Sequence, residues 1–215
     1  MSSFEGLAGF SPKPICWFGV RVSGATAGQE FNLTPKTNYM NYNTNIRLVN
    51  VFGCAIIVAM TKHIVRQIHA RLLKNGLTIA IAESCTGGSV SKLLTDCAGS
   101  SSYFMLGAVT YSNESKQRIL KVPSALIKKH GAVSRLVAIK MADNIRKMGK
   151  TDLGLGITGI AGPGGGTPSK PVGTVFISLS TKNKTTCWKF NFSGSRASIR
   201  KNAAIKALAL ALEAC

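Results

Sequence analysis

A short apolar run that breaks into a turn of small residues restricts the possible folds more than any other stretch of this chain. Residues 78–82 (TIAIA) have the composition of a buried strand, and residues 83–88 (ESCTGG) follow directly. A helical pattern of apolar residues begins after the two glycines. A strand that passes into a helix through such a turn is where α/β folds place binding and catalytic sites. Two interpretations stay open at this point: an active-site turn and an ordinary strand-to-helix loop.

The turn combines close backbone approach with reactive side chains. Gly87 and Gly88 have no side chain, so they let the backbone approach a ligand closely. The helix that follows is expected to present free N–H groups and a partial positive charge at its start. Ser84 and Thr86 add hydroxyl groups, and Cys85 adds a thiol. We therefore take this turn as the candidate active site.

The chain beyond residue 60 alternates helices and strands. Apolar periodicity predicts the element order α-β-α-β-α-α-β-β-β-α. Strands are predicted at residues 78–82, 103–111, 153–158, 172–180 and 185–192. Residues 112–116 are expected to form a polar turn, and Ser134 is expected to cap a helix whose inner face includes Met141 and Met148. Alternation followed by a hairpin predicts an α/β fold, three-layer α/β/α, with a mixed, mostly parallel central sheet.

The two ends of the chain differ in composition. Residues 1–59 are rich in Ser, Thr, Asn and Gly and show no sustained period, so we expect a poorly structured extension before a domain at residues 60–215. One hypothesis is that Met60 is the true start of translation. The chain has 27 Lys and Arg against 8 Asp and Glu, a net charge of +19. Such a charge favours anionic partners (nucleic acid, acidic membranes or phosphorylated small molecules) or has no specific partner.

Sequence patterns disfavour several classes of site. The cysteines are dispersed with no C-x-x-C pair, and the histidines form no H-E-x-x-H motif. We therefore expect no metal site, no cofactor, and reduced thiols in a cytoplasmic protein. The apolar run at residues 48–60 is too short for a membrane-spanning helix of about 20 residues. The glycine-rich run at residues 159–166 lacks the P-loop and Rossmann signatures. Residues 89–92 (SVSK) match a motif of penicillin-recognising enzymes, but K-T-G is absent.

A lysine is the remaining group that could activate a hydroxyl or thiol in the turn. Lys116 follows the second predicted strand, and adjacent parallel strands end at one edge of a sheet. Lys116 is therefore expected near Ser84. The third strand ends at the same edge, with Thr158, Gly159 and Gly162. A lysine becomes a general base when burial or nearby positive charge lowers its pKa. The alternative is a solvated surface lysine.

Five motifs, taken in order, resemble the CinA C-terminal domain family. They are AESCTGG at 82–88, GAVTYSNESK at 107–116, HGAVS at 130–134, GITGIAGPGGG at 156–166 and KPVGTV at 170–175. The resemblance runs from about Thr61 to the end of the chain and leaves residues 1–59 without a counterpart. Stand-alone members of this family are nicotinamide mononucleotide amidohydrolases. The resemblance thus implies hydrolysis of that carboxamide to nicotinate mononucleotide and ammonia.

The resemblance also implies roles for individual residues. Ser84 falls at the position of the family's nucleophile, and Lys116 falls at that of its general base. Tyr111, Thr158 and Arg200 fall where the family has groups that contact substrate or support catalysis. Of these, Arg200 is expected to meet the phosphate of the nucleotide.

Backbone groups complete the expected site. Either Thr86, Gly87 and Gly88 or the loop at residues 159–162 is expected to bind substrate and hold the oxyanion. The family often has an acidic residue in a G-D-R turn before its last helix. This chain has GSR at residues 194–196 and lacks that acid.

Two alternatives remain open. A nucleic-acid-binding or regulatory module with the same fold and no activity would fit the net charge, although the chain has no RNP-like aromatic motif and no helix-turn-helix signature. Cys85 is a rival nucleophile, because thiols are intrinsically stronger nucleophiles than hydroxyls. Related domains tend to self-associate. The expected partners are therefore nicotinamide mononucleotide and a homo-oligomer, rather than nucleic acid or a membrane.

Overall fold

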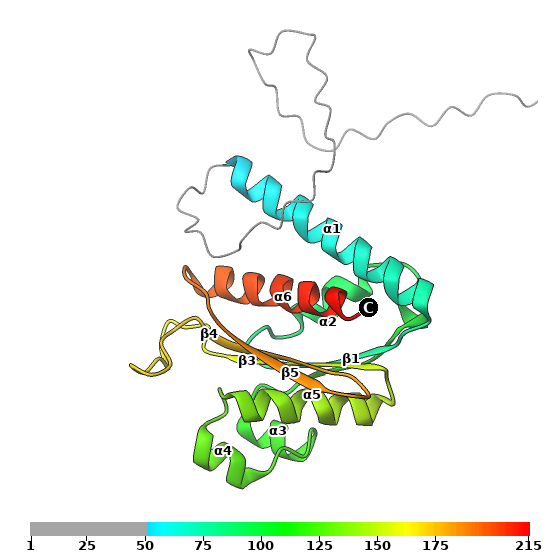
Figure 1. The fold of residues 1–215 in the computed structure, drawn as a ribbon. Helices are drawn as coiled ribbons and strands as arrows, with labels where there is room; N and C mark the ends of the chain where they lie inside the picture. Colours follow the sequence, from blue (N-terminus) through cyan, green and yellow to red (C-terminus); the bar gives the residue numbers. More distant parts are fainter. Residues whose placement is uncertain (1–50) are drawn as a thin grey trace, which may run out of the picture. The chain divides into compact units, whose positions relative to one another are not determined.

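Six α-helices and a five-stranded sheet make up the part of the protein that the structure describes. A computed structural model describes residues 51–215, with side chains from Ala59 onward (Figure 1). The elements are α1 (Val51–Asn75), β1 (Ile79–Glu83), α2 (Ser89–Thr95), η1 (Ser100–Ser102), β2 (Phe104–Val109), α3 (Asn113–Arg118), α4 (Ser124–His130), α5 (Arg135–Gly149), β3 (Leu153–Gly159), β4 (Thr174–Ser180), β5 (Thr185–Asn191) and α6 (Arg196–Glu213). Residues 1–50, most of the expected extension, lie outside the described residues. Of the helices in the described part, none combines the length and apolar character needed to cross a membrane.

The sheet is mixed, as the sequence predicts. Its strand order is β2-β1-β3-β4-β5. β1 is parallel to both β2 and β3, whereas β4 and β5 form an antiparallel hairpin on β3. Glu83 at the end of β1 lies opposite Val109 in β2 and Ile157 in β3. The carboxyl ends of three strands therefore lie level at one edge.

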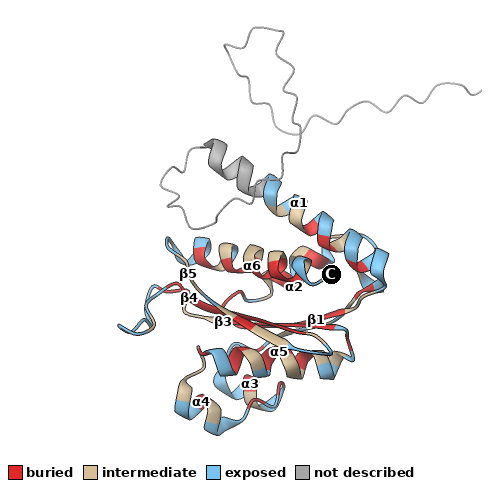
Figure 2. Ribbon diagram, viewed as in Figure 1, coloured by how far each residue is buried: buried red, intermediate tan, exposed pale blue. Residues whose placement is uncertain are grey.

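Helices cover both faces of the sheet, which confirms the predicted three-layer α/β/α fold. α1, α2 and α6 lie on one face, and α3, α4 and α5 lie on the other (Figure 1). Figure 2 shows the buried residues on the sheet and on the helix surfaces that face it. One core cluster joins Ile68 and Leu72 of α1 to Leu208 of α6 and the sheet. The second joins Met141 and Ile145 of α5 to the other face.

Serine side chains start three of the helices. Ser112, Ser134 and Ser195 each accept a hydrogen bond from the backbone N–H three residues further on. Such bonds satisfy donors that the first helical turn leaves free. The predicted cap at Ser134 is confirmed. The cap at Ser112 turns the polar run SNESK into the first turn of α3, so the prediction of a simple turn at residues 112–116 is wrong.

Two further predictions differ from the structure. Met148 was expected on the inner face of α5, but it is 45% exposed. In the last turn of the helix the position against the sheet is taken by Gly149 instead, where an added Cβ would come within 2.9 Å of the Ala80 side chain. α1 starts at Val51, so the expected boundary between residues 59 and 60 falls inside this helix. The apolar residues before Met60 extend the helix because lengthening an existing helix is far easier than starting one.

Glycines in β3 let α5 lie directly against the sheet. A Cβ atom added to Gly156 would come within 2.6 Å of both the Ala138 carbonyl oxygen and the Ala142 nitrogen, which belong to the backbone of α5. Only a residue without a side chain permits this approach. The spacing of α5 from β3 is thus fixed by glycine at this position.

Candidate active site

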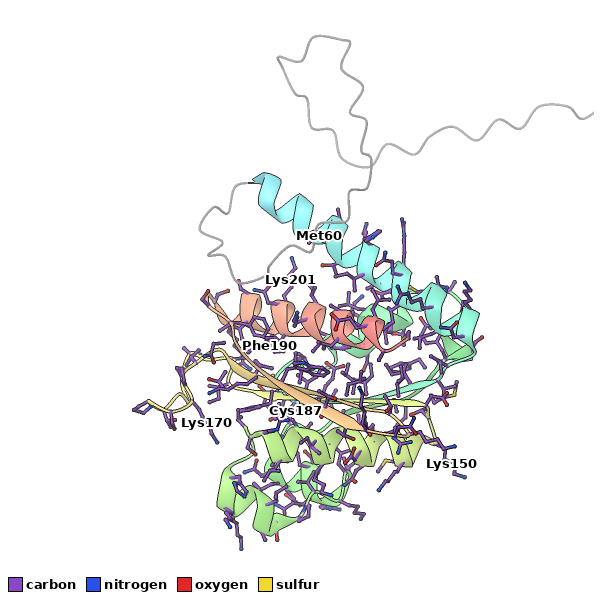
Figure 3. All side chains as sticks on the ribbon, viewed as in Figure 1. Met60, Lys150, Lys170, Cys187, Phe190 and Lys201 are labelled. Atoms are coloured by element: carbon purple, nitrogen blue, oxygen red, sulfur yellow. The ribbon has the colours of Figure 1, made fainter. Side chains whose placement is uncertain are left out.

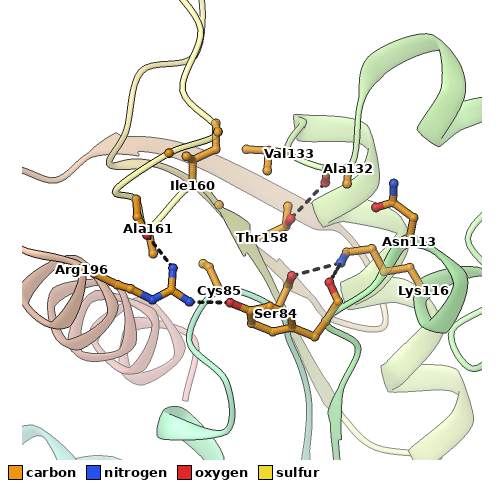
Figure 4. Close-up of a pocket in the computed structure, with 15 residues that line it drawn as sticks. Ser84, Cys85, Asn113, Lys116, Ala132, Val133, Thr158, Ile160, Ala161 and Arg196 are labelled. Carbon is orange, nitrogen blue, oxygen red and sulfur yellow. Dashed lines mark hydrogen bonds between the residues drawn. The ribbon is translucent and has the colours of Figure 1, made fainter.

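A pocket lies where the three parallel strands end. It has a volume of about 270 Å³, just below the range of roughly 300–1,000 Å³ found for small-molecule sites. Five segments of the chain contribute to it, as Figure 4 shows. The lining residues are Ser84, Cys85, Tyr111, Asn113, Lys116, Ala132, Val133, Thr158, Gly159, Ile160, Ala161, Gly162, Gly164, Gly165 and Arg196. Six of the predicted site residues are among them, whereas Thr86, Gly87, Gly88 and Arg200 are not.

Ser84 and Lys116 form a hydrogen-bonded pair in this pocket. The Lys116 Nζ atom lies 3.0 Å from Ser84 Oγ (Figure 4). The serine is 7% exposed and the lysine 1% exposed. β1 delivers the serine, and the first turn of α3 delivers the lysine. The fold thus brings together two side chains that are 32 residues apart in the sequence.

Two carbonyl groups orient the Lys116 amine. Its Nζ atom also donates to the Thr110 oxygen at 2.8 Å and to the Tyr111 oxygen at 3.3 Å. A neutral amine has two hydrogens and one lone pair. When both hydrogens go to these carbonyls, the lone pair is left for the Ser84 hydroxyl proton. The geometry suits a general base.

Burial lowers the pKa of Lys116 from 10.5 to about 8. The cause is desolvation, which disfavours the charged ammonium form. Within the described residues, the salt bridges are Lys92–Asp96 and Arg118–Glu114. Lys116 takes part in neither, so no carboxylate partner raises its pKa again. A base with a pKa near the working pH is well matched to proton transfer.

Cys85 lies beside Ser84 but is poorly suited to act as a nucleophile. Burial raises the pKa of its thiol to about 11. The reactive form of cysteine is the thiolate, and this thiol stays protonated at neutral pH. The sulfur packs against the glycine loop, since a Cβ on Gly159 would come within 3.0 Å of it. The rival-nucleophile hypothesis therefore loses support.

Glu83 occupies the start of α2. This carboxylate is fully buried, and it accepts hydrogen bonds from the backbone N–H groups of Gly88, Val90 and Ser91 at 2.9, 3.2 and 2.8 Å. It also accepts one from the Ser91 hydroxyl at 2.7 Å. The expectation of free N–H groups at this helix start is therefore wrong. The sequence placed a carboxylate in the turn without indicating that it points back into the helix.

Arg200 holds the turn from behind. Its Nε donates to the Cys85 carbonyl at 3.1 Å, and its Nη2 donates to the Thr86 carbonyl at 3.0 Å. A Cβ on Gly87 would come within 2.7 Å of Nη2, so this glycine makes room for an arginine rather than for a ligand. Arg200 does not line the pocket. Its predicted contact with a phosphate has no support in this geometry.

Arg196, one helical turn earlier, does line the pocket. It donates to the Gly162 carbonyl and to the Tyr111 hydroxyl, both at 2.6 Å (Figure 4). It therefore links α6 to the glycine loop and to the segment after β2. Sequence reasoning noted this arginine only as part of the GSR turn. The signal that could have identified it is its place next to the Ser195 cap, on the same face of the helix as Arg200.

The remaining pocket wall comes from β3 and the segment before α5. Thr158 is buried, and its hydroxyl donates to the Ala132 carbonyl at 3.0 Å. This bond ties the end of β3 to the HGAVS segment. Ala132, Val133 and Asn113 were not predicted as site residues. Their side chains suggest no chemistry, and the signal that could have identified them is their place in the HGAVS and GAVTYSNESK motifs. Among the described residues, no group of three or more His, Cys, Asp or Glu side chains could hold a metal ion.

Comparison with known proteins gives one consistent match. Residues 61–215 match the CinA C-terminal domain family. A CinA-like protein of Geobacter sulfurreducens is 48% identical over 154 residues, 71% of this chain and 37% of that protein. A CinA-like protein of Syntrophotalea carbinolica is 53% identical over 140 residues, 65% of this chain and 34% of that protein. The chain thus spans about a third of the length of these relatives.

Solved structures share the fold. The competence/damage inducible protein CihA from Agrobacterium tumefaciens has a TM-score of 0.69 and 35% identity, covering 72% of this chain and 96% of that one. A competence-damaged protein (CinA) superfamily protein from Escherichia coli has a TM-score of 0.68 and 28% identity, covering 83% of this chain and all of that one. The likeness therefore extends over almost the whole of both solved chains.

Proposed function

This chain belongs to the CinA C-terminal domain family, and on that premise we propose that it deamidates nicotinamide mononucleotide to nicotinate mononucleotide and ammonia. The observation that carries the proposal is the buried contact of 3.0 Å between Lys116 Nζ and Ser84 Oγ inside a pocket. Ser-Lys pairs are a known variant of the nucleophile-and-base arrangement. The pair supplies what hydrolysis of an unactivated amide needs.

Acylation is the first half of the proposed reaction. Neutral Lys116 takes the proton of Ser84 as Oγ attacks the carboxamide carbon. The tetrahedral intermediate collapses when its nitrogen takes that proton back from Lys116 and leaves as ammonia. Ser84 then carries the nicotinate mononucleotide acyl group as an ester.

Deacylation reuses the same base. Lys116 takes a proton from a water molecule that attacks the ester carbon, and it returns the proton to Ser84 Oγ as the ester bond breaks. Nicotinate mononucleotide leaves, and the free dyad is restored. The two carbonyls that bind Lys116 hold it in place through both halves.

The charge of the pocket supports an anionic substrate. Arg196 carries a positive charge in the pocket lining, and none of the described lining residues is a carboxylate. Arg196 is bonded to a carbonyl and a hydroxyl, which leaves its charge available to a phosphate. We therefore assign to Arg196 the phosphate contact that the sequence had suggested for Arg200.

Product analysis tests the proposed function. The purified protein is expected to release ammonia and nicotinate mononucleotide in equal amounts from nicotinamide mononucleotide, and to act far more slowly on nicotinamide riboside, which lacks the phosphate. Absence of ammonia release from either compound would remove the proposal. Retention of DNA with a steep salt dependence, in the same preparation, would then favour the nucleic-acid-binding alternative.

The rate is expected to rise with pH through the pKa of Lys116. Only the neutral amine can act as a base, so below a pKa of about 8 the active fraction grows about tenfold per pH unit. We expect kcat/KM to increase about tenfold from pH 6.5 to 7.5 and to level off above pH 8. Initial rates in buffers of constant ionic strength measure this profile. A flat profile over this range would contradict Lys116 as the base, and the Cys85→Ala variant should show the same curve as the wild type.

A further inference from the structure

Arg200 grips the turn that carries the nucleophile without reaching the pocket. Its guanidinium is bonded to two successive carbonyls, those of Cys85 and Thr86. Gly87 permits this approach, because any side chain there would strike Nη2. Arginine is the one side chain whose planar fork can hold two carbonyls at once in this way. The contact fixes the orientation of the Cys85–Thr86 and Thr86–Gly87 peptide planes.

The backbone N–H groups of the turn fall into two sets. The donors from Gly87 to Ser91 all have acceptors: Gly87 donates to Ser84, Ser89 to Thr86, and the other three to Glu83. The N–H groups of Cys85 and Thr86 have no recorded acceptor in any other described residue. They are the two that immediately follow the nucleophile.

These two observations are connected by the geometry of the peptide bond. In a trans peptide the C=O and N–H groups point in opposite directions. When Arg200 holds the Cys85 carbonyl, the Thr86 N–H is turned to the side away from Arg200. The bond from Gly87 N–H to the Ser84 carbonyl, 3.0 Å long, does the same for the Cys85 N–H.

We infer that the N–H groups of Cys85 and Thr86 form the oxyanion hole and that Arg200 is the positioning residue for both. It aims the Thr86 N–H directly through the Cys85 carbonyl, and the Cys85 N–H indirectly, because it holds the Thr86–Gly87 peptide whose N–H binds the Ser84 carbonyl. The inference rests on the proposed function in that it assumes acyl transfer at Ser84. Arg200 acts through the backbone and does not touch the substrate. Arg196, in contrast, acts on the substrate directly. Of the two arginines of α6, Arg196 therefore serves substrate binding, and Arg200 serves catalysis by positioning the backbone donors.

Kinetics of two matched variants test this division. Arg200→Lys keeps the charge but cannot hold two carbonyls, and we expect kcat to fall about 100-fold with KM changed less than threefold, since a lost oxyanion donor typically reduces kcat by 10²–10³. Arg196→Lys is expected to raise KM and to leave kcat within about threefold. Lys201→Gln removes a charge from the residue next to Arg200, where the side chain is exposed and projects away from the sheet (Figure 3). That control is expected to match the wild type.

A covalent probe of the nucleophile tests the oxyanion hole independently of which substrate the protein hydrolyses. A fluorophosphonate reacts with Ser84 to form a phosphonate ester: Oγ bonds to phosphorus, Lys116 takes the hydroxyl proton, and fluoride leaves. The phosphoryl oxygen needs the same donors in this step, and mass spectrometry measures the rate. We expect labelling of Arg200→Lys to be about 100-fold slower than that of the wild type. If the wild type labels but releases no ammonia, the proposed function fails and this inference stands. If Arg200→Lys retains wild-type kcat or labelling rate, this inference is wrong.

A backbone variant covers the case in which Arg200→Lys fails to fold. Replacing Thr86 by its α-hydroxy acid converts one amide to an ester, which removes the N–H donor, keeps every side chain, and makes the Cys85 carbonyl a weaker acceptor for Arg200. The same loss of labelling rate is expected with the melting temperature near that of the wild type. Unchanged labelling in the ester variant would place the oxyanion hole elsewhere, for example in the glycine loop, and would overturn the assignment.

Discussion

Ser84→Ala is expected to lower kcat for deamidation by about 10,000-fold or more, the loss that follows removal of a nucleophile that works as one unit with its base. Among the described residues that line the pocket, Ser84 is the one whose hydroxyl is bonded to the Lys116 amine. The neighbouring thiol is protonated because burial raises the pKa of Cys85 to about 11. Ammonia release under saturating substrate measures the effect.

Two further variants make this result interpretable. Cys85→Ala removes the thiol but keeps the backbone N–H, and we expect kcat to fall less than tenfold. Lys116→Met keeps the length of the side chain without its amine and should be as slow as Ser84→Ala. The double variant Ser84→Ala, Lys116→Met should be no slower than either single one, because the two groups form one catalytic unit. Substantial activity in Ser84→Ala would refute the assignment of the nucleophile.

Gly156→Val is expected to destabilise the fold by about 3 kcal/mol or more, at the upper end of the range for overpacked cores. The added Cβ would lie 2.6 Å from two backbone atoms of α5, and a helix backbone cannot rotate away as a side chain can. The helix must move off β3, which carries one wall of the pocket. A fall in melting temperature of roughly 10 °C is expected for a domain of this size, measured by circular dichroism.

The glycine loop offers a matched control. Gly164→Val makes the same chemical change where nothing lies within 4 Å of the added Cβ. Its melting temperature should stay within about 2 °C of the wild type. Equal melting temperatures for the two variants would show that the close approach of α5 does not limit stability.

The sequence predicted the parts of this molecule that depend on the order and period of residues. The alternation of elements predicted a mixed sheet with helices on both faces, and adjacent parallel strands then required the turns after β1 and β2 to share an edge. The 3.0 Å contact between Ser84 and Lys116 follows from that topology. A general rule about strand ends was sufficient here, because Ser84 lies immediately beyond β1 and Lys116 lies in the first turn of α3, the next helix after β2.

The predictions that failed concern side chains that have several possible hydrogen-bond partners nearby. Glu83 could have faced the pocket, but it binds the start of α2, because three unsatisfied N–H groups attract a carboxylate strongly. Arg196 and Arg200 are four residues apart on one helix, and only the packing of α6 against the turn decides which of them reaches the pocket. Such choices depend on differences of one or two ångströms that periodicity does not encode.

The buried lysine also affects how this protein can evolve, because it lowers the stability of the fold. Because its pKa falls from 10.5 in an exposed side chain to about 8 in the fold, the unfolded chain binds a proton in that pH window that the folded protein does not, so stability rises with pH between these values. Below pH 8 the protonated lysine opposes folding by up to about 3 kcal/mol. A population selected only for heat resistance would therefore drift toward an apolar residue at position 116. The resulting protein would be more stable but would lack the general base of the reaction. Only selection for the reaction therefore retains a lysine at this position.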